Sequence, residues 1–387
     1  MPAVGVKNFI GERLVQAKNA RGLSSVALSD LAGISSSSIS LYEANKQNPK
    51  VETVESLARA LNVPVNFFFK DIQVDRPGKL FYRSMAAATK ASRVVSEAKY
   101  EWALETVDYL LTFFDLPKLN LPDQDVPEDF KSLDTNRIEC IANELRAYWN
   151  LGTSPVASMT RTLEANGIIV WRTKFGAETQ DAFSEYRTPH PFVILSSDKQ
   201  NYFRSRFDAA HELGHLVLHR NVDRSTLNKS SDHKLMESQA HLFAGAFLAP
   251  AEAYYRDLYA VSLDAFRALK PRWNVSIAMQ IMRARHLGLV TEHEERRLWI
   301  NMGRRKWRVS EPLDDSTEPE SPKLIKQGIK MLIEEGVKSR EQILDDLSLH
   351  ANDVENLIGE RGYLHLGTSS RPVFKASAGK VVPFRKN

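Results

Sequence analysis

Two histidines and a glutamate within one helical turn are the residues whose types and spacing could do chemistry. His211, Glu212 and His215 form a His-Glu-x-x-His pattern inside the apolar run 207–219. Residues four apart project from the same face of a helix. Two imidazoles placed in this way can bind one Zn²⁺, and the glutamate then lies beside the metal as a general base. The pattern therefore predicts a metal-dependent hydrolase site.

The apolar character of this run decides between a metal site and an ordinary amphipathic helix with surface histidines. A helix rich in leucine and valine should be buried, and buried histidines and carboxylates are costly unless a ligand or hydrogen bonds satisfy them. The metal-binding interpretation is therefore favoured. The apolar side chains between and beyond the histidines are Leu213, Leu216, Val217 and Leu218.

A catalytic zinc usually has three protein ligands and one position left for water. An extension of the motif on the same segment would need a glycine at 218 and a histidine at 221, but the chain has Leu218 and Asn221. The third ligand is therefore expected from another helix. His219 lies one turn beyond His215, and we expect it to support a ligand through hydrogen bonds or to cap the helix.

The helix-forming segment 237–248 offers this third ligand. Glu237 is the preferred residue. His241 lies one turn further on the same face and is the rival; if it is not a ligand, we expect it to stand next to one. Asp232 and His233 in the polar loop before the helix are weaker alternatives.

A longer pattern surrounds these positions: Arg206-Phe207, Ala210 to His215, His219, Glu237, Ala240, Phe243-Ala244, Leu248 and Pro250. With this pattern the segment 167–250 resembles the ImmA/IrrE family of metallopeptidases. The resemblance implies a zincin-like α+β domain in which His211, His215 and Glu237 hold zinc and Glu212 is the base.

One position departs from that family. Gln239 stands where many members have a second acidic residue, which leaves Glu237 as the only carboxylate there. Known members are intracellular and cut, or trigger the cutting of, a repressor protein. The resemblance therefore implies a protein substrate such as a repressor or an antitoxin.

Composition sets broader limits. The chain has 387 residues, of which 43% are hydrophobic and 26% charged, which is enough for two or three ordinary globular domains. No apolar run reaches the roughly 18 residues that span a bilayer, the first residues lack a signal-peptide core, and Cys140 is the only cysteine. We therefore expect a cytoplasmic protein without disulfides and without a membrane partner.

The N-terminal segment 1–75 is predicted to form five short helices with tight turns. A helix, a glycine turn at Gly33 and a second helix are the layout of a helix-turn-helix unit. The expected helices are Gly11–Ala20, one capped by Ser24 or Ser25, one opening at Ile34 and Ser35, Val51–Leu61 and Val65–Phe69. The residues that carry a further pattern are Leu31 to Ser35, Ile39-Ser40, Tyr42-Glu43, Pro49, Leu57-Ala58 and Leu61. On these residues the segment resembles the Xre/Cro, lambda-repressor-like DNA-binding domain.

This resemblance implies contacts with double-stranded DNA. Serine is a weak reader of bases compared with arginine, glutamine or asparagine, and residues 1–70 carry eight basic against five acidic side chains. The alternative is a helix-turn-helix fold used for protein contacts or dimerisation. The residues expected in the major groove are Ser35, Ser36, Ser37, Ser38 and Ser40, and those expected at phosphates are Asn45, Lys46, Gln47 and Asn48.

The rest of the chain divides by composition and periodicity. Residues 76–126 are expected to be a helical linker whose long helix, about 91–114, carries an apolar stripe typical of a core or a homodimer seam. Residues 127–308 are expected to be the peptidase domain, with helices, short strands at 168–171, 182–184 and 192–195, and a helical extension. A small sheet beside the zinc helix would present an edge to an extended substrate.

The C-terminal region is expected to be less regular. Residues 309–321 hold five acids and no base and are predicted to be a flexible linker. Residues 322–363 are predicted to form a small helical element, and the basic tail 364–387 to be disordered. Six basic residues between 296 and 308 are expected at a solvated helix end, with DNA contact as the alternative.

The sequence thus predicts a mainly α chain with a small β-sheet that joins a DNA-binding domain to a zinc endopeptidase. One hypothesis is a regulator that cleaves a repressor or antitoxin, as in toxin–antitoxin, phage or stress regulation. The other is a transcription factor whose zinc domain senses or binds a partner without proteolysis.

Overall fold

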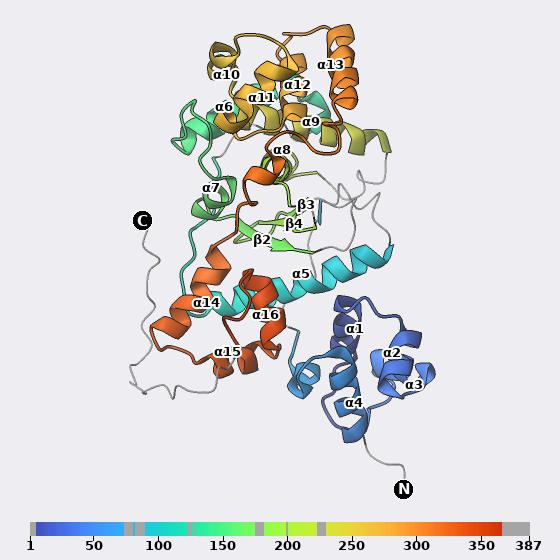
Figure 1. Cartoon of the computed structure of the whole chain (residues 1–387). Helices are drawn as coiled ribbons and strands as arrows, with labels where there is room; N and C mark the ends of the chain where they lie inside the picture. Colours follow the sequence, from blue (N-terminus) through green and yellow to red (C-terminus); the bar gives the residue numbers. More distant parts are fainter. Residues whose placement is uncertain are drawn as a thin grey trace.

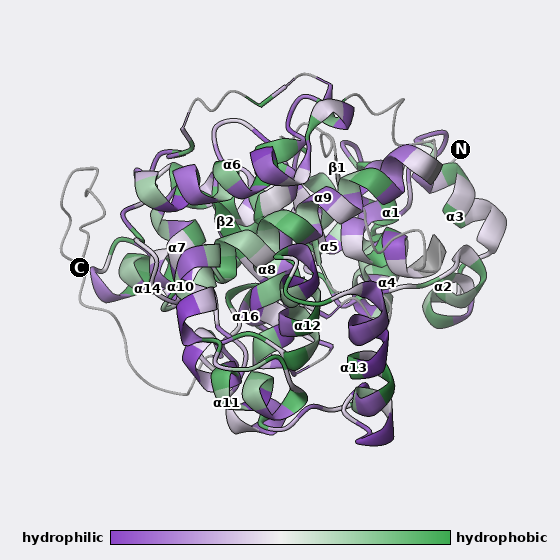
Figure 2. Cartoon of the chain, turned by 90° about the horizontal axis from the view of Figure 1, so that it is seen from above, coloured by the Kyte–Doolittle hydropathy of each residue, from purple (hydrophilic) through white to green (hydrophobic). Residues whose placement is uncertain are grey.

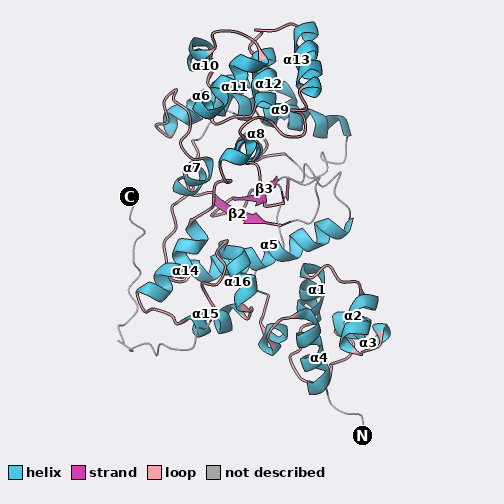
Figure 3. Ribbon diagram, viewed as in Figure 1, coloured by secondary structure: helices cyan, strands magenta, loops and turns pink. Residues whose placement is uncertain are grey.

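The computed structural model describes residues 5–72, 80–81, 90–122, 126–127, 129–174, 182–198, 200–222 and 230–365. The basic tail beyond residue 365 and parts of the predicted linker lie outside these residues. The described chain is mainly helical with one small sheet, which confirms the predicted fold class (Figure 1, Figure 3). In this described part, no helix has the length and apolar character needed to cross a membrane.

The N-terminal domain forms the helices that its turn residues predict. Ser24 caps α2 by accepting the backbone N–H of Ala27, and Gly33 ends α2 in the left-handed region with φ 66°. Ser35 then caps α3. These short-range signals explain why the predicted ends agree with the structure to within two residues. The helices are α1 (Gly11–Ala20), α2 (Ser25–Ala32), α3 (Ser36–Glu43), α4 (Val51–Leu61) and the 3₁₀ helix η1 (Val65–Phe69).

The long helix α5 (Lys90–Leu111) runs through the middle of the molecule, between the N-terminal domain and the sheet (Figure 1). Its predicted apolar stripe is buried within the chain, where Tyr100, Leu104 and Val107 join one hydrophobic cluster. The same cluster takes in the N-terminal domain, one sheet face and the C-terminal helices. The stripe is therefore core of this chain, and the segment is a central packing element rather than a linker.

The sheet contains four strands in the order β1-β3-β4-β2. β2 and β4 are parallel, whereas β3 is antiparallel to both β4 and β1. Alternate residues of β2 point to opposite faces, so that Trp171 packs with α5 and Val170 packs with the metal-motif helix. The strands are β1 (Leu80–Phe81), β2 (Ile169–Thr173), β3 (Ala182–Glu185) and β4 (Phe192–Ser196).

On the sheet face opposite α5 lies α8 (Tyr202–Leu218), which carries the metal motif and packs beside α9 (Ser230–Leu248). The two helices approach closely at Gly214, where an added Cβ would stand 3.1 Å from the Phe243 ring and 3.2 Å from Ala240. This close approach brings the two halves of the predicted site together. Around them lie α6 (Thr135–Tyr148), α7 (Met159–Ala165), α10 (Ala251–Asp257), α11 (Leu263–Trp273), α12 (Ile277–His286) and α13 (Glu292–Arg304).

The helix α13 is strongly hydrophilic along much of its surface (Figure 2). It carries part of the predicted basic cluster, of which Arg305 forms an ion pair with Asp264 at 2.7 Å. The next helices, α14 (Leu324–Glu334), α15 (Arg340–Leu347) and α16 (Ala351–Ile358), pack against α5 and share its core. The predicted small helical element is therefore built onto the central helix.

The acidic segment 309–321, expected to be a flexible linker, is instead packed against the peptidase helices. Glu311 accepts the backbone N–H groups of Ile277 and Ala278 at the start of α12, and its carboxylate also meets the buried ammonium of Lys270 at 2.8 Å. Asp314 meets the same ammonium at 2.6 Å. Carboxylates satisfy the free N–H groups and the dipole at a helix start, which explains why this acidic segment is held.

Candidate metal centre

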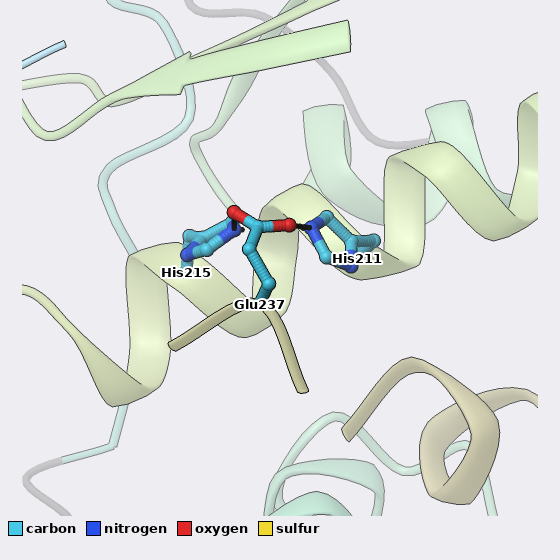
Figure 4. A group of neighbouring side chains, drawn as sticks. All are labelled: His211, His215 and Glu237. Carbon is cyan, nitrogen blue, oxygen red and sulfur yellow. Dashed lines mark hydrogen bonds and ion pairs between the residues drawn. The ribbon is translucent and has the colours of Figure 1, made fainter. Parts of the chain in front are cut away.

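The metal-motif residues lie on a buried face of α8. The side chains of His211 and His215 are 1% and 2% exposed, and that of Glu237 on α9 is 14% exposed. Figure 4 shows the carboxylate of Glu237 lying between the two imidazoles. Within the described part of the chain, these three side chains form a group whose potential ligand atoms all lie within 4.8 Å of one another.

The distances in this group match a tetrahedral zinc site. The two Nε2 atoms of His211 and His215 are 3.0 Å apart. One carboxylate oxygen of Glu237 lies 3.5 Å from His211 Nε2, and the other lies 3.4 Å from His215 Nε2. Bonds of about 2.0–2.1 Å to a central zinc place tetrahedral ligand atoms about 3.3 Å apart. Two imidazoles and one carboxylate are also a donor set of the catalytic type, with one position left open.

Hydrogen bonds behind the site define which nitrogen of His215 faces the metal position. The Gln239 amide nitrogen donates to the carbonyl oxygens of Phe130 at 2.7 Å and Leu133 at 3.3 Å, so its oxygen must face His219 Nε2, 3.0 Å away. His219 Nε2 therefore carries a proton, and its Nδ1 accepts. His215 Nδ1, 3.0 Å from that atom, must then donate. This leaves the lone pair of His215 on Nε2, toward the metal position.

The electrostatics agree with this arrangement. Burial, together with the adjacent His215, lowers the pKa of His219 to about 3, so that its ring is neutral. Burial alone would raise the pKa of Glu237, but the adjacent rings of His211 and His215 hold it well below its ordinary value. The site therefore presents a carboxylate and a neutral supporting imidazole, the forms that zinc ligation requires.

The Glu212 carboxylate is hydrogen-bonded to a residue that the sequence analysis did not predict as part of the site. The Ser184 hydroxyl on β3 donates to one oxygen of the Glu212 carboxylate at 2.6 Å, and both side chains are buried. The bond fixes the orientation of the carboxylate beside His211. Ser184 lay inside a predicted strand, but no sequence signal showed that this strand would face the metal helix.

The rival ligands take other positions. The ring of His241 lies 4.7 Å from that of His211 and 5.6 Å from that of Phe207, centroid to centroid, outside the three-residue group. Asp232 forms an ion pair with Lys131 at 3.1 Å. His233 stands 4.0 Å from the Glu237 carboxylate. The structure thus brings together the preferred set and places His241 next to a ligand.

A cleft of about 810 Å³ opens beside the metal group, and His211 and Glu212 form part of its wall. Its size lies within the range of ligand-binding clefts. Aromatic and sulfur-containing side chains are numerous in its lining, and charged residues of both signs, including Asp208, Glu311 and Asp314, lie among them. These lining residues include Phe207, His241, Met279, Met282, Trp299 and Trp307, with Arg204 and Arg308.

The sheet edge that was expected to receive a substrate is partly occupied. β1 pairs with β3 so that Leu80 faces Glu185 and Phe81 faces Ser184. The chain itself therefore covers this edge next to Glu212. Within the described residues, the cleft between α8, α12 and α13 is the better place for a substrate.

The serines predicted to read DNA lie at the exposed start of α3. Ser35 caps the helix by accepting the Ser38 N–H at 3.2 Å, and the Ser40 hydroxyl donates to the Ser36 carbonyl at 3.0 Å. Ser35, Ser36, Ser37 and Ser40 are exposed. Some of these hydroxyls thus have structural roles, and DNA contact by this face stays a prediction.

The predicted phosphate contacts differ in their roles. Asn45 adopts a left-handed φ of 54°, and its side-chain oxygen accepts the N–H of Gly11 at 2.7 Å, which joins the end of α3 to the start of α1. Lys46 and Gln47 are exposed next to it. Asn48, the fourth predicted phosphate contact, is exposed as well.

Comparisons with known families agree with this division of the chain. Residues 14–68 match the family model described as Helix-turn-helix, and residues 163–285 match a peptidase family model described as IrrE N-terminal-like domain. The two matches confirm the predicted fusion of a DNA-binding domain to a metallopeptidase-like domain. No curated protein matches the chain.

Proposed function

We propose that this chain is a DNA-binding regulator whose second domain is a zinc-dependent endopeptidase that cleaves a repressor or antitoxin protein. The observation that carries the proposal is the group of His211, His215 and Glu237 at tetrahedral spacing, with Glu212 beside it on a cleft wall. The helix-turn-helix match supports the DNA-binding half. The IrrE-type match supports the peptidase half.

Each residue of the site would have a separate role in peptide hydrolysis. His211, His215 and Glu237 would hold the zinc, which supplies a Lewis acid for the scissile carbonyl and for water. Glu212, oriented by Ser184, takes the proton of the attacking water and passes it to the leaving amine. The Gln239–His219 pair keeps His215 in the tautomer that can bind metal.

The cleft indicates the kind of substrate. Its wall combines Phe207, Trp299 and Trp307 with three methionines, and both basic and acidic side chains lie at the same surface. Such a lining suits a polypeptide segment with apolar side chains. A folded regulator with an exposed loop of this composition would fit the proposal.

The alternative function is a transcription factor that uses the zinc domain as a sensor or a partner-binding module. The three ligand side chains are by themselves enough to hold a metal, which supports this alternative. A sensor needs the metal ligands but does not need Glu212 as a base.

The change Glu212→Gln distinguishes the two functions because it keeps the size of the side chain but removes the base. Purified, zinc-loaded wild type and variant would be incubated with extract from cells that lack the chain, and new protein N-termini would be labelled and identified. We expect specific new termini with wild type and at least a hundredfold fewer with the variant, consistent with loss of general-base catalysis of about 10²–10⁴-fold.

The control is Glu292→Gln, the same chemical change at an exposed position of α13. It should cleave as wild type does. Identical termini from wild type and Glu212→Gln would contradict the peptidase function, and normal regulation in cells by Glu212→Gln would favour the sensor.

A further inference from the structure

A second cavity, of about 570 Å³, lies on the α5 side of the sheet, away from the metal centre. Its walls come from the N-terminal domain at Arg21, from α5 at Lys99 and Trp102, from β2 and from α16. It thus lies where the DNA-binding domain, the sheet of the peptidase domain and the C-terminal helices meet. Neither family match assigns a role to this combination of walls.

The cavity wall is strongly basic. Two acids also line it, but Asp353 is bound by the Arg21 guanidinium at 2.7 Å, and Glu355 accepts the backbone N–H groups of Gly362 and Leu364. Both carboxylates therefore already have partners within the chain. The six cationic residues that line it are Arg21, Lys99, Arg172, Lys174, Lys326 and Arg361.

Several of these cations form no ion pair within the described part of the chain. Lys326 has an ion pair with Glu360 at 2.7 Å. Among the described residues, no carboxylate lies within ion-pair distance of Lys99, Lys174 or Arg361. Uncompensated positive charge gathered in a hollow surface attracts anions, because low-dielectric walls focus the field.

Lys99 shows the need for an anion most clearly. Within the described part of the chain its ammonium donates only to the carbonyl oxygen of Lys174, at a long 3.4 Å, and burial lowers its pKa. Lys99 and Lys174 both line this cavity, and the Lys99 ammonium lies next to the Lys174 backbone. A charge-assisted hydrogen bond from an anion would replace the water that burial removes from the ammonium.

Two buried indoles add further donors. The side chains of Trp102 and Trp171 are buried, and within the described part of the chain neither indole N–H has an acceptor. Most buried tryptophan N–H groups have a partner. Arg21 packs over the Trp102 ring at 5.3 Å, and the apolar part of the wall includes Trp171, Ile325 and Leu357.

We propose that this cavity binds a small metabolite that carries one or more phosphate groups, with the anionic part at Lys99 and Lys174. Its volume lies within the range of about 300–1,000 Å³ found for small-molecule sites, which is too small for a protein or a duplex. The mixed basic and apolar wall fits a phosphorylated organic molecule. Such a ligand would contact the DNA-binding domain through the Arg21 wall and the peptidase sheet through β2.

The test measures binding of inorganic tripolyphosphate to the intact chain by calorimetry, with sodium chloride added to equal ionic strength as the blank. Wild type should bind saturably at one site. Lys174→Gln, at an exposed position of the wall, should bind about 10-fold more weakly or worse, since a hydrogen bond to a charged group contributes about 1.5–3 kcal/mol. Lys99→Gln should do the same.

Arg296→Gln removes an exposed cation on α13, outside the cavity, and is the matched control. It should bind as wild type does. Absence of saturable binding to wild type would overturn the proposal. Equal binding by wild type and Lys174→Gln, or an equal loss in Arg296→Gln, would also overturn it because the anion would then bind elsewhere or without specificity. Because Lys174 is exposed, its result stands even if Lys99→Gln does not fold. The measurement needs neither zinc nor DNA, so it is independent of the proposed peptidase.

Discussion

The Gln239 amide orients two histidine rings from the rear of the metal group. Its nitrogen is committed to two backbone carbonyls, so its oxygen imposes one tautomer on His219, which imposes one on His215. A carboxylate at 239 could not donate to those carbonyls. The glutamine is therefore consistent with the structure behind it, and its departure from the family pattern has a local physical reason.

Replacing Gln239 with leucine should weaken zinc binding while the ligands themselves stay in place. His219 would lose its acceptor and His215 its fixed tautomer, and changes of this kind cost about 10–100-fold in metal affinity. Competition with a chelating dye measures the affinity. Ser238→Ala, at the exposed neighbouring position, is the control and should match wild type. Unchanged zinc affinity in a folded Gln239→Leu protein would show that the relay does not support the site.

At the residue scale, the sequence predicted what local spacing determines. His211, Glu212 and His215 lie within one turn, and Glu237 on the next helix follows them as expected. Ser184 was not predicted because a strand far away in the chain must fold against α8 before its hydroxyl meets Glu212.

At the level of elements, the acidic segment 309–321 connects the parts of the peptidase domain. Glu320 accepts the N–H groups of Met159 and Thr160 at the start of α7 and pairs with the buried Arg206 of α8. Burial alone would raise the pKa of Glu320, but the Arg206 guanidinium and these hydrogen bonds hold it below its ordinary value. This anchor therefore connects the segment to the helix that carries the metal motif.

The depressed pKa of Glu320 gives a pH-dependent stability. Its contribution is present above the unfolded pKa of about 4.3 and is lost as the pH falls through the lower folded pKa. Glu320→Gln should therefore destabilise the chain by about 3 kcal/mol near neutral pH, because it leaves Arg206 buried and unpaired. The difference from wild type should shrink below the unfolded pKa.

Urea unfolding at about pH 7 and about pH 4 measures this difference. The exposed Glu318→Gln is the control and should unfold as wild type does at both values. A difference between Glu320→Gln and wild type that is the same size at both pH values would contradict the assignment.

The sequence predicted the ends of helices but did not predict that the acidic segment 309–321 is packed. Caps such as Ser24, Ser35 and the Thr291–Glu294 capping box act over a few residues and can be read directly. The partners of Glu320 lie between 114 and 162 residues away in the chain. A run of acids therefore resembled a solvated linker, although each buried carboxylate has a distant partner.

Across the whole molecule, the DNA-binding domain is fixed to the rest of the chain. Arg13 on α1 meets Glu105 on α5 at 2.5 Å, and Arg21 meets Asp353 on α16. Periodicity predicted the helices that carry these residues. It did not predict the ion pairs between them, because the charged partners belong to different domains. The intact chain should therefore present α3 to DNA as one body with the peptidase domain.

This arrangement, with mild positive charge and serine at the start of α3, predicts modest and salt-sensitive duplex binding by the intact chain. Lys46→Gln should weaken binding to all sequences similarly and lower the slope of log affinity against log salt by about 1. Titration of labelled duplex at several salt concentrations measures both. Absence of duplex binding by wild type at low salt would favour a protein-contact role for the domain.

Arg296→Gln is the control for that titration because it removes an exposed cation from α13. It should leave the slope unchanged. A decrease in Arg296→Gln without a decrease in Lys46→Gln would place DNA on the α13 basic cluster rather than on the end of α3.

The most direct test of the whole account is the zinc content of the purified chain by metal analysis. Wild type should hold one zinc per chain, as should Glu212→Gln and His241→Ala, because neither changed residue belongs to the group of three ligands. His215→Ala and Glu237→Ala should lose most of their zinc. Equal zinc in wild type and His215→Ala would contradict the metal centre, and loss in His241→Ala but not in Glu237→Ala would show that the third ligand is His241.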